Sequence, residues 1–316
     1  MEQRRKNITL IVILGLLIVC SLALALVKES GSGSLVDKTL FSIGDPAAVD
    51  RIEIQSKGSE VSLFKQDETW MLNDTLKAEQ NLVTVLLSLL RDVEVTRRAP
   101  KASESSIRNQ LLEDGFKVSV YGKDELVQTF YAAGNDTKTV SYMMSSEDQQ
   151  PYIMSIPGYG SYVAGIFEIP FNDWRDRLIL SSTWRSLQML DLQYAEFPQY
   201  SFKIQFNREF LEVADMKDVD TTRMMSYIEG FNYLQADRFI DAGQQPQYDS
   251  LLQTPSTVSI QIRDINKVSS KSLRFYPLLP NDPMMLAYVE EDQQMVLFET
   301  DRIQNLFAVK DDFRLK

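Results

Sequence analysis

The sequence predicts an α+β fold, in which an N-terminal transmembrane helix precedes a tandem-duplicated ectodomain of mixed strands and helices with antiparallel sheets. Three observations predict this class. One apolar run of bilayer length lies near the N-terminus. Most later segments alternate between apolar and polar residues, which is the period of a half-buried strand. Short motifs of the first half recur in the second half at a separation of roughly 140 residues.

The apolar run, residues 8–27, contains no charged residue and follows Arg4, Arg5 and Lys6. A helix of this length spans about 30 Å, the thickness of the hydrocarbon core of a bilayer. Basic residues stay on the cytoplasmic side, so we expect residues 1–7 to be a cytoplasmic tip. The expected location is the bacterial inner membrane, with the lipid bilayer contacted through residues 8–27 and a periplasmic ectodomain.

A cleaved signal peptide and a lipidated N-terminus are the two alternatives for this run. Apolar regions of signal peptides usually have about 7–15 residues and end at a small-residue cleavage site. The stretch Leu17–Cys20 approaches a bacterial lipidation motif, but Val19 is bulky where a small residue is expected. We therefore favour an uncleaved anchor.

Residues 28–40 are expected to form a flexible tether, because Ser and Gly dominate its first part. Residues 41–180 form the first expected copy of the ectodomain. Helical spacing over Leu82–Leu90 predicts a helix, with Asp74 or Glu79 as the candidate carboxylate at its start. Strand patterns of this copy lie at residues 52–54, 61–63 and 116–120.

Residues 181–316 form the second expected copy and repeat the plan of the first. Asp220 is a candidate N-cap for a helix whose apolar stripe runs from Met224 to Leu234. Strand patterns lie at residues 202–206, 211–213, 258–262 and 273–275.

Three pairs of short motifs support a duplication. The two members of each pair are separated by 140, 144 and 139 residues, respectively, so we infer a tandem repeat. The pairs are Leu111–Leu112 with Leu251–Leu252, each shortly before a Val-Ser-(Val/Ile) strand; Glu147–Gln150 with Glu291–Gln294; and Asp173–Arg177 with Asp312–Lys316.

The chain lacks residue types that common catalytic and metal sites need. It has no histidine, and its single cysteine, Cys20, lies inside the apolar run. Ser-His-Asp and Cys-His nucleophile systems and conventional zinc sites are therefore excluded from the ectodomain. A disulfide within the ectodomain is excluded as well, which suits a bacterial periplasmic protein. We expect no cofactor, no metal and no enzymatic activity.

The chain is acidic, with a formal net charge of −11. An acidic surface repels nucleic acid and anionic lipid headgroups, and we expect no nucleic-acid partner. A basic partner protein would be attracted by this charge, although solubility alone is the simpler explanation.

A loop of the first copy is the main candidate for partner binding. Residues 157–162 combine glycines, which allow sharp turns, with Tyr159 and Tyr162. This loop occurs in the first copy only, and loops on rigid scaffolds often carry function. Trp184 and Arg185 extend the candidate surface, since Trp and Arg are enriched at the energetic centres of interfaces. The structural alternatives are a turn with packed tyrosines and a buried Trp184 that joins the copies.

Asp173, Arg175, Asp176 and Arg177 form the densest charged cluster. Two carboxylates about 5–10 Å apart can act as acid and base in a glycosidase. We favour a network of arginines and carboxylates that closes the repeat unit, with Trp174 packed inside. A similar cluster ends the second copy, and a chain terminus is a poor place for an active site.

Several segments of the first copy resemble a known family. They are Val49–Ile54, Glu68–Leu72, the Leu82–Leu90 helix and Asp173–Arg177. They are similar to a bacterial domain of unknown function that follows one transmembrane helix in envelope proteins, including auxiliary subunits of gliding-motility ABC transporters. The resemblance covers roughly residues 40–180 and, more weakly, the second copy. The family's Tyr-Gly-Leu-Asp-x-Pro turn is replaced by Leu112–Phe116, and the resemblance implies no catalytic residue.

These features predict a non-catalytic, membrane-anchored scaffold or accessory subunit of a bacterial cell-envelope complex for transport, secretion or gliding. Its partners would be other inner-membrane or envelope proteins. A periplasmic glycan- or peptide-binding module is the alternative, and it predicts a groove lined by exposed aromatic side chains. A carboxylate-based hydrolase is a more remote alternative, and it predicts two carboxylates in a deep pocket, one of them with a raised pKa.

Overall fold

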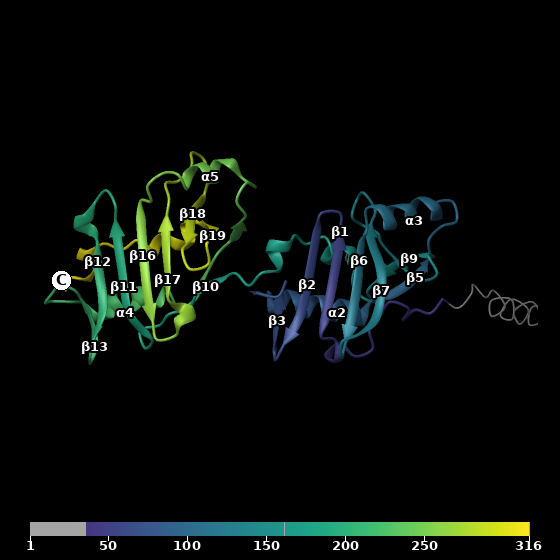
Figure 1. The fold of residues 1–316 in the computed structure, drawn as a ribbon, viewed down its shortest axis with the longest axis horizontal. Coiled ribbons are helices and arrows are strands. Elements are labelled where there is room, and N and C mark those ends of the chain that lie inside the picture. The colour runs from purple at the N-terminus through teal and green to yellow at the C-terminus, as the bar shows by residue number, and fades with distance from the viewer. Residues whose placement is uncertain (1–35, 161, 316) are drawn as a thin grey trace, which may run out of the picture. The chain divides into compact units, whose positions relative to one another are not determined.

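The computed structural model describes residues 36–160 and 162–315 (Figure 1). The predicted cytoplasmic tip, the predicted transmembrane helix and most of the predicted tether lie outside the described residues. None of the helices within the described ranges is long and apolar enough to span a membrane.

The predicted fold class is wrong. Strands hold 39% of the structure and helices 24%, so the described chain is mostly antiparallel β-sheet. A transmembrane helix is not part of the described fold, whose longest helix, Gln80–Asp92, has 13 residues. Strands outweigh helices because alternation of apolar and polar residues with a period of two dominates the described sequence, whereas its helical apolar stripes are few and short.

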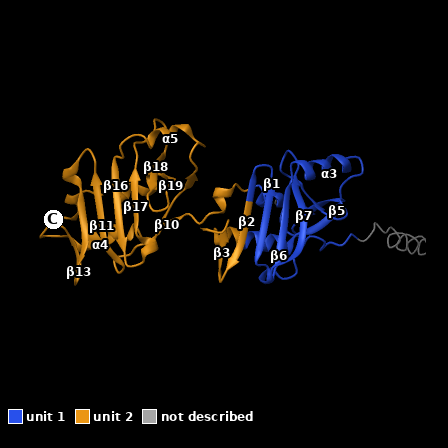
Figure 2. Ribbon diagram, viewed as in Figure 1, with its two compact units in different colours: residues 1–60, 84–168 blue, residues 61–83, 169–316 orange. Residues whose placement is uncertain are grey.

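The described residues form two compact units, which Figure 2 shows in different colours. Unit 1 holds the described residues up to Glu60 together with Thr84–Glu168. Unit 2 holds Val61–Val83 together with Ile169–Lys316. These bounds differ from those of the two predicted copies, residues 41–180 and 181–316, and the division into two copies stays a prediction.

The first sheet has nine strands. They are β1 (Arg51–Ser56), β2 (Ser59–Gln66), β3 (Thr69–Leu72), β4 (Leu76–Lys77), β5 (Glu94–Arg98), β6 (Phe116–Gly122), β7 (Glu125–Gly134), β8 (Ser141–Ser145) and β9 (Pro151–Ser155). Their order in the sheet is β4-β3-β2-β1-β6-β7-β8-β9-β5. The accompanying helices are η1 (Pro46–Ala48), α2 (Gln80–Asp92), α3 (Glu104–Glu113), η2 (Val163–Ile166) and η3 (Phe171–Trp174).

Buried side chains of α2 and a chain of aromatic rings form the core of unit 1. Leu86 and Leu90 of α2 are fully buried, and burial of each contributes about 1.5–3 kcal/mol. The ring of Phe130 on β7 contacts Phe41 and Phe167 edge to face, at 5.9 Å between ring centroids in both pairs. The second contact holds the segment after η2 against the sheet.

The second sheet has eight strands, and a further pair of strands forms a small sheet beside it. They are β10 (Leu178–Leu180), β11 (Leu187–Tyr194), β12 (Phe202–Asn207), β13 (Phe210–Val213), β14 (Leu234–Gln235), β15 (Arg238–Ile240), β16 (Val258–Asp264), β17 (Lys271–Phe275), β18 (Met284–Val289) and β19 (Gln294–Glu299). The eight-stranded sheet has the order β13-β12-β11-β16-β17-β18-β19-β15, and β10 pairs with β14.

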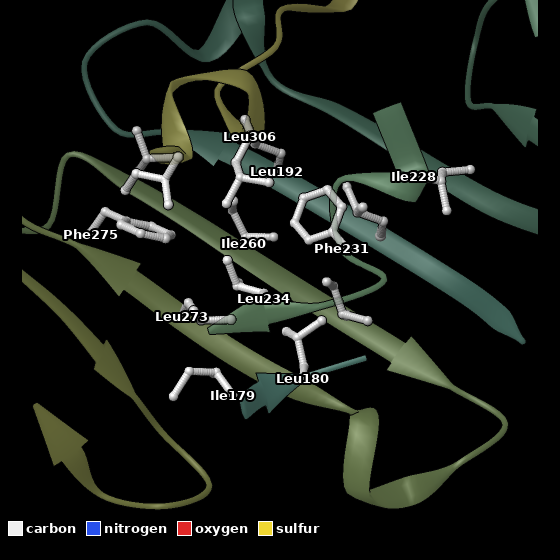
Figure 3. Close-up of a cluster of buried hydrophobic side chains, with 14 of the residues drawn as sticks. Ile179, Leu180, Leu192, Ile228, Phe231, Leu234, Ile260, Leu273, Phe275 and Leu306 are labelled. Carbon is white, nitrogen blue, oxygen red and sulfur yellow. The ribbon is translucent and has the colours of Figure 1, made fainter. Parts of the chain in front are cut away.

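Short helices connect these strands and cover the sheet. They are η4 (Pro198–Tyr200), α4 (Thr221–Glu229), α5 (Pro246–Leu251), η5 (Lys267–Ser269), α6 (Thr300–Ile303), η6 (Gln304–Leu306) and η7 (Lys310–Phe313). Figure 3 shows the main core of unit 2, where Ile260 and Leu273 of the sheet lie among Ile228 of α4, Phe231 just after it, and Leu306 of η6.

The two large sheets follow one plan. Strands β1, β2, β3, β5 and β6–β9 have the same order as β11, β12, β13, β15 and β16–β19. Similar backbone contacts close each plan: Ala78 bridges Arg175, and Val219 bridges Arg314. In the first plan the Glu79 N–H donates to the carbonyl of Trp174 at 2.8 Å, and in the second plan the Asp220 N–H donates to the carbonyl of Phe313 at the same distance, 2.8 Å. Duplication of an ancestral unit would explain this agreement.

Candidate functional site

An apolar groove in unit 1 is the candidate site. It has a volume of about 640 Å³ and lies between α2 and the segment from Ile156 to Ile166. Its apolar lining consists of Val85 and Leu89 of α2 and of Ile156, Tyr159, Tyr162, Val163 and Ile166. Thr84, Ser88, Arg91 and Asp92 supply the polar part of the lining. A mostly apolar concave surface with a few polar groups is the usual composition of a ligand-binding site.

Tyr159 is the exposed aromatic residue of this groove. Its side chain is 72% exposed, and it follows Gly158, whose φ of +80° is a backbone conformation that favours glycine. The Tyr159 N–H donates to the carbonyl of Ile156 at 3.0 Å, which closes the turn. Tyr159 also borders a second hollow of about 340 Å³ that Thr39 and other residues line. The position of Tyr159 agrees with its predicted role in contacting a partner, which stays a prediction.

Tyr162 has a different position from Tyr159. It is half-buried, and its hydroxyl donates to Glu168, whose other carboxylate oxygen lies 2.7 Å from Nζ of Lys138. Burial, followed by the hydrogen bond to Glu168 and its negative charge, raises the pKa of Tyr162. A Cβ atom at Gly134 would overlap the Tyr162 hydroxyl group, so the Tyr162 side chain occupies space that only glycine leaves open. Tyr162 therefore forms a wall of the groove.

The segment that carries the tyrosine wall is fixed to the sheet. Val163 and Ala164 of η2 are almost completely buried. The Ala164 N–H donates to the hydroxyl of Ser141 on β8 at 2.9 Å, and Phe167 packs on Phe130. The groove is thus preformed along this side, which lowers the entropic cost of binding.

One ion pair lies at the α2 end of the groove. Arg91 donates to both carboxylate oxygens of Asp92 at 2.7 Å, and this hydrogen bonding lowers the pKa of Asp92. Asp92 is the one carboxylate among the residues that line the groove. A hydrolase of the kind considered above needs two carboxylates in one pocket, and the groove does not bring two together.

Trp184 and Arg185 lie in unit 2, in the turn between β10 and β11. Trp184 is 39% exposed, so the alternative of a buried Trp184 is wrong. Cζ of Arg185 lies 4.3 Å from the centroid of the Trp184 ring, a cation–π contact. The structure therefore places the four candidate residues as two pairs, Tyr159 with Tyr162 in unit 1 and Trp184 with Arg185 in unit 2.

Comparison with protein families assigns the chain. The model of a domain of unknown function, DUF4340, matches residues 70–251, more than half of the chain. The chain belongs to the DUF4340 family. No curated protein and no solved structure matches it. The DUF4340 match begins in β3 and ends in α5, so it continues well past residue 180, where the resemblance in the sequence becomes weaker. It includes all four candidate residues.

The charged cluster Asp173–Arg177 of this DUF4340 chain is divided among separate partners. Arg177 bonds Asp173 at 3.2 Å, and Lys77 bonds Asp176 at 2.9 Å. Trp174 is completely buried. The buried Trp174 and the pair of Arg177 with Asp173 agree with the interpretation that we favoured, whereas Asp176 is bonded by Lys77 and not by an arginine.

Arg175 differs from its neighbours because it is buried. Its guanidinium lies 3.7 Å from the ring centroid of Phe239 on β15 and donates to Oε1 of Gln294 on β19 at 3.0 Å. Burial lowers the pKa of Arg175, partly offset by the charges of Asp241 and Asp292. Since Arg175 also bridges Ala78, it links the segment Val61–Val83 to the sheet of unit 2.

The α2 side of the DUF4340 groove was missed in the sequence. Val85 belongs to the apolar stripe that predicts the helix, and a residue of such a stripe is expected to be buried. In the structure Val85 is 54% exposed and lines the groove. An available signal is that Ser88, which lies three positions after Val85 and neighbours it on the helix surface, is small and polar.

Proposed function

We propose that this DUF4340 chain is a non-catalytic accessory or scaffold subunit of a bacterial cell-envelope complex, and that the groove of unit 1 holds an apolar segment of a partner protein. The observation that carries the proposal is the preformed apolar groove with the 72% exposed Tyr159 at its edge. A monomer that leaves Tyr159 and Val85 in water keeps apolar area available for binding, at about 25 cal/mol per Å² buried.

The chemistry of the lining favours a peptide segment over a charged ligand. Arg91 and Asp92 neutralise each other, so the described residues that line the groove offer no unpaired charge. The hydroxyl groups of Ser88 and Tyr159 can bond the polar edge of a bound segment. An amphipathic helix that places its apolar face in a groove is one common form of such recognition.

The proposed location is the bacterial inner membrane, with the N-terminus in the cytoplasm and the described units in the periplasm. Support comes from the sequence, in which the apolar residues 8–27 follow three basic residues and are proposed to contact the bilayer. Holding the units at a membrane raises the local concentration of membrane partners and strengthens weak contacts with them. Transport, secretion and gliding complexes of the envelope are the proposed assemblies.

Site-specific crosslinking tests the proposal. A photoreactive residue at position 85 should crosslink a protein partner in native membranes, identified by mass spectrometry. Tyr159→Ala should reduce the crosslinked product about tenfold, the effect of losing an interface anchor. Tyr233→Ala is the matched control, because Tyr233 is a similarly exposed tyrosine, at 66%, in unit 2. Absence of a crosslink at position 85, or equal effects of the two alanine variants, would refute the groove as the binding site.

A further inference from the structure

Two turns meet at one end of the second sheet. One is Thr183–Ser186, between β10 and β11, and the other is Ile265–Val268, which leads into η5 after β16. The Ile265 N–H donates to the carbonyl of Ser186 at 2.9 Å, so the two turns lie side by side. We call these two turns the unit 2 tip.

A buried carboxylate holds the unit 2 tip together. Asp264 is 4% exposed, and one of its oxygens accepts hydrogen bonds from the hydroxyls of Ser182 at 2.5 Å and Ser186 at 2.8 Å. Its other oxygen accepts the N–H of Asn266 at 2.8 Å. The Asp264 side chain therefore holds both turns in place. Hydrogen bonds to a charged carboxylate are stronger than those between neutral groups.

The side chains that the tip presents outward are apolar. Ile265 is 67% exposed, Val268 is 76% exposed, and Trp184 is 39% exposed. Single exposed apolar residues are normal, whereas several on adjoining turns make the unit 2 tip a candidate interaction site.

The charges around the tip are basic, although the chain as a whole carries −11. Arg185, Arg263 and Lys267 are exposed, and within the described part of the chain none of them forms an ion pair. The carboxylate of Asp264 is buried and engaged by hydroxyl and N–H donors. The tip thus combines a tryptophan, two aliphatic side chains and three unpaired cations.

We propose that the unit 2 tip inserts into the surface of a bilayer that contains anionic lipids. Tryptophan favours the boundary between headgroups and acyl chains, and exposed aliphatic side chains gain by entering the apolar layer. Lipid phosphates attract basic residues, so three cations of the tip would lie near them: Arg185, Arg263 and Lys267. Of these, Arg185 is stacked on Trp184. Exposed apolar side chains surrounded by cations match a bilayer surface, where an apolar layer lies beneath anionic headgroups. This surface lies in unit 2 and is independent of the groove proposed for the partner protein.

Tryptophan fluorescence of the full chain tests the proposal. Of the three tryptophans, Trp70 is 8% exposed and Trp174 is fully buried, so Trp184 is the one that bilayer contact would change. We expect lipids brominated on the acyl chains to quench Trp184 in vesicles of phosphatidylglycerol and phosphatidylethanolamine. The quenching should be weaker in phosphatidylcholine vesicles and should fall as salt is added.

Three variants separate insertion of the tip from attachment by any other part of the chain. Ile265→Ser with Val268→Ser should abolish the quenching, and Trp184→Phe should remove its signal. Leu126→Ser with Val127→Ser is the matched control, because that pair is 58% and 56% exposed in unit 1, and quenching should be unchanged. Circular dichroism checks that each variant folds. Absence of quenching in anionic vesicles would overturn the proposal and point to a protein partner. Quenching that survives the Ile265 and Val268 substitutions, or Trp184→Phe, would overturn it as well, because another part of the chain would then make the bilayer contact.

Discussion

At the scale of single residues, Gly134 shows that a glycine can be required by a distant side chain. Its backbone conformation is ordinary, but the space beside it is filled by the ring of Tyr162. The tyrosine wall of the groove therefore depends on a residue of β7, 28 positions earlier in the chain. A neighbour as close as this leaves no room for a methyl group.

Substitution of this glycine should disturb both stability and the groove. Gly134→Ala should lower the free energy of unfolding by about 1–3 kcal/mol, because Tyr162 must move and loses its hydrogen bond to Glu168. Gly160→Ala is the control in the same loop, since nothing lies within 4 Å of a Cβ atom there. Chemical denaturation of both variants measures the difference. Equal stabilities would mean that Tyr162 has another acceptable position.

At the scale of elements, two of the helix starts could be read from the sequence. The Asp220 carboxylate accepts the Arg223 N–H at 3.1 Å, which confirms it as the N-cap of α4. The Glu79 carboxylate accepts the N–H of Asn81 at 3.2 Å beside the start of α2, whereas Asp74 lies in a turn with φ of 69°. Such caps depend on residues only two or three positions apart, so the local sequence suffices to predict them.

The N-cap of α4 gives a quantitative prediction. Asp220→Ala should lower the free energy of unfolding by about 1 kcal/mol, because the Arg223 N–H loses its acceptor. Ser103→Ala at the N-cap of α3 should cost much less, since the Ser103 side chain makes no capping hydrogen bond. Thermal and chemical unfolding measure both variants. A loss at Ser103 as large as that at Asp220 would contradict the assignment.

The end of the α4 helix could not be read from its apolar stripe. The stripe continues to Leu234, but α4 ends at Glu229, with Gly230 as its C-cap. Leu234 instead begins β14, which pairs with β10, and its side chain lies in the same core (Figure 3). A side chain can reach one core from a helix or from a strand, so an apolar residue alone does not fix the element.

At the scale of the whole molecule, several tyrosines make stability depend on alkaline pH. Burial, followed by the charge of Asp312, raises the pKa of Tyr194 to about 12. Burial, followed by a hydrogen bond to Asp282, raises the pKa of Tyr248 to about 12. The pKa of Tyr162 is raised as well. An unfolded tyrosine loses its proton near pH 10, so above this pH the folded state binds more protons than the unfolded state.

The contribution of these tyrosines to the free energy of unfolding should therefore be constant below about pH 10 and should fall as the pH rises from there toward 12. Urea unfolding at a series of pH values measures the slope. Tyr248→Phe should make the fall shallower, whereas Tyr233→Phe, at an exposed position, should leave it unchanged. An identical slope in the Tyr248 variant would show that Asp282 and burial do not hold its proton.

The whole molecule also shows one plan with two different ends. The buried Trp174 closes the first plan and the buried Phe313 closes the second, each next to an arginine. Arg175 is buried against Phe239, whereas Arg314 is exposed and bonds Asp311 at 3.1 Å. The paired sequence motifs Asp173–Arg177 and Asp312–Lys316 indicated that these two ends are equivalent. The surroundings of Arg175 and Arg314 differ because different strands pack near each of them.

The sequence by itself determined what neighbouring residues decide: the alternating strands, the start of α4, and the lack of histidine. It also favoured an α+β class with a transmembrane helix, and the described fold corrected this to antiparallel sheets with short helices. Only the tertiary structure decided that Val85 lines a groove, that Tyr162 needs Gly134, and that the turn of Trp184 lies beside the turn of Ile265. These arrangements join residues far apart in the chain, and periodicity does not encode which of them meet.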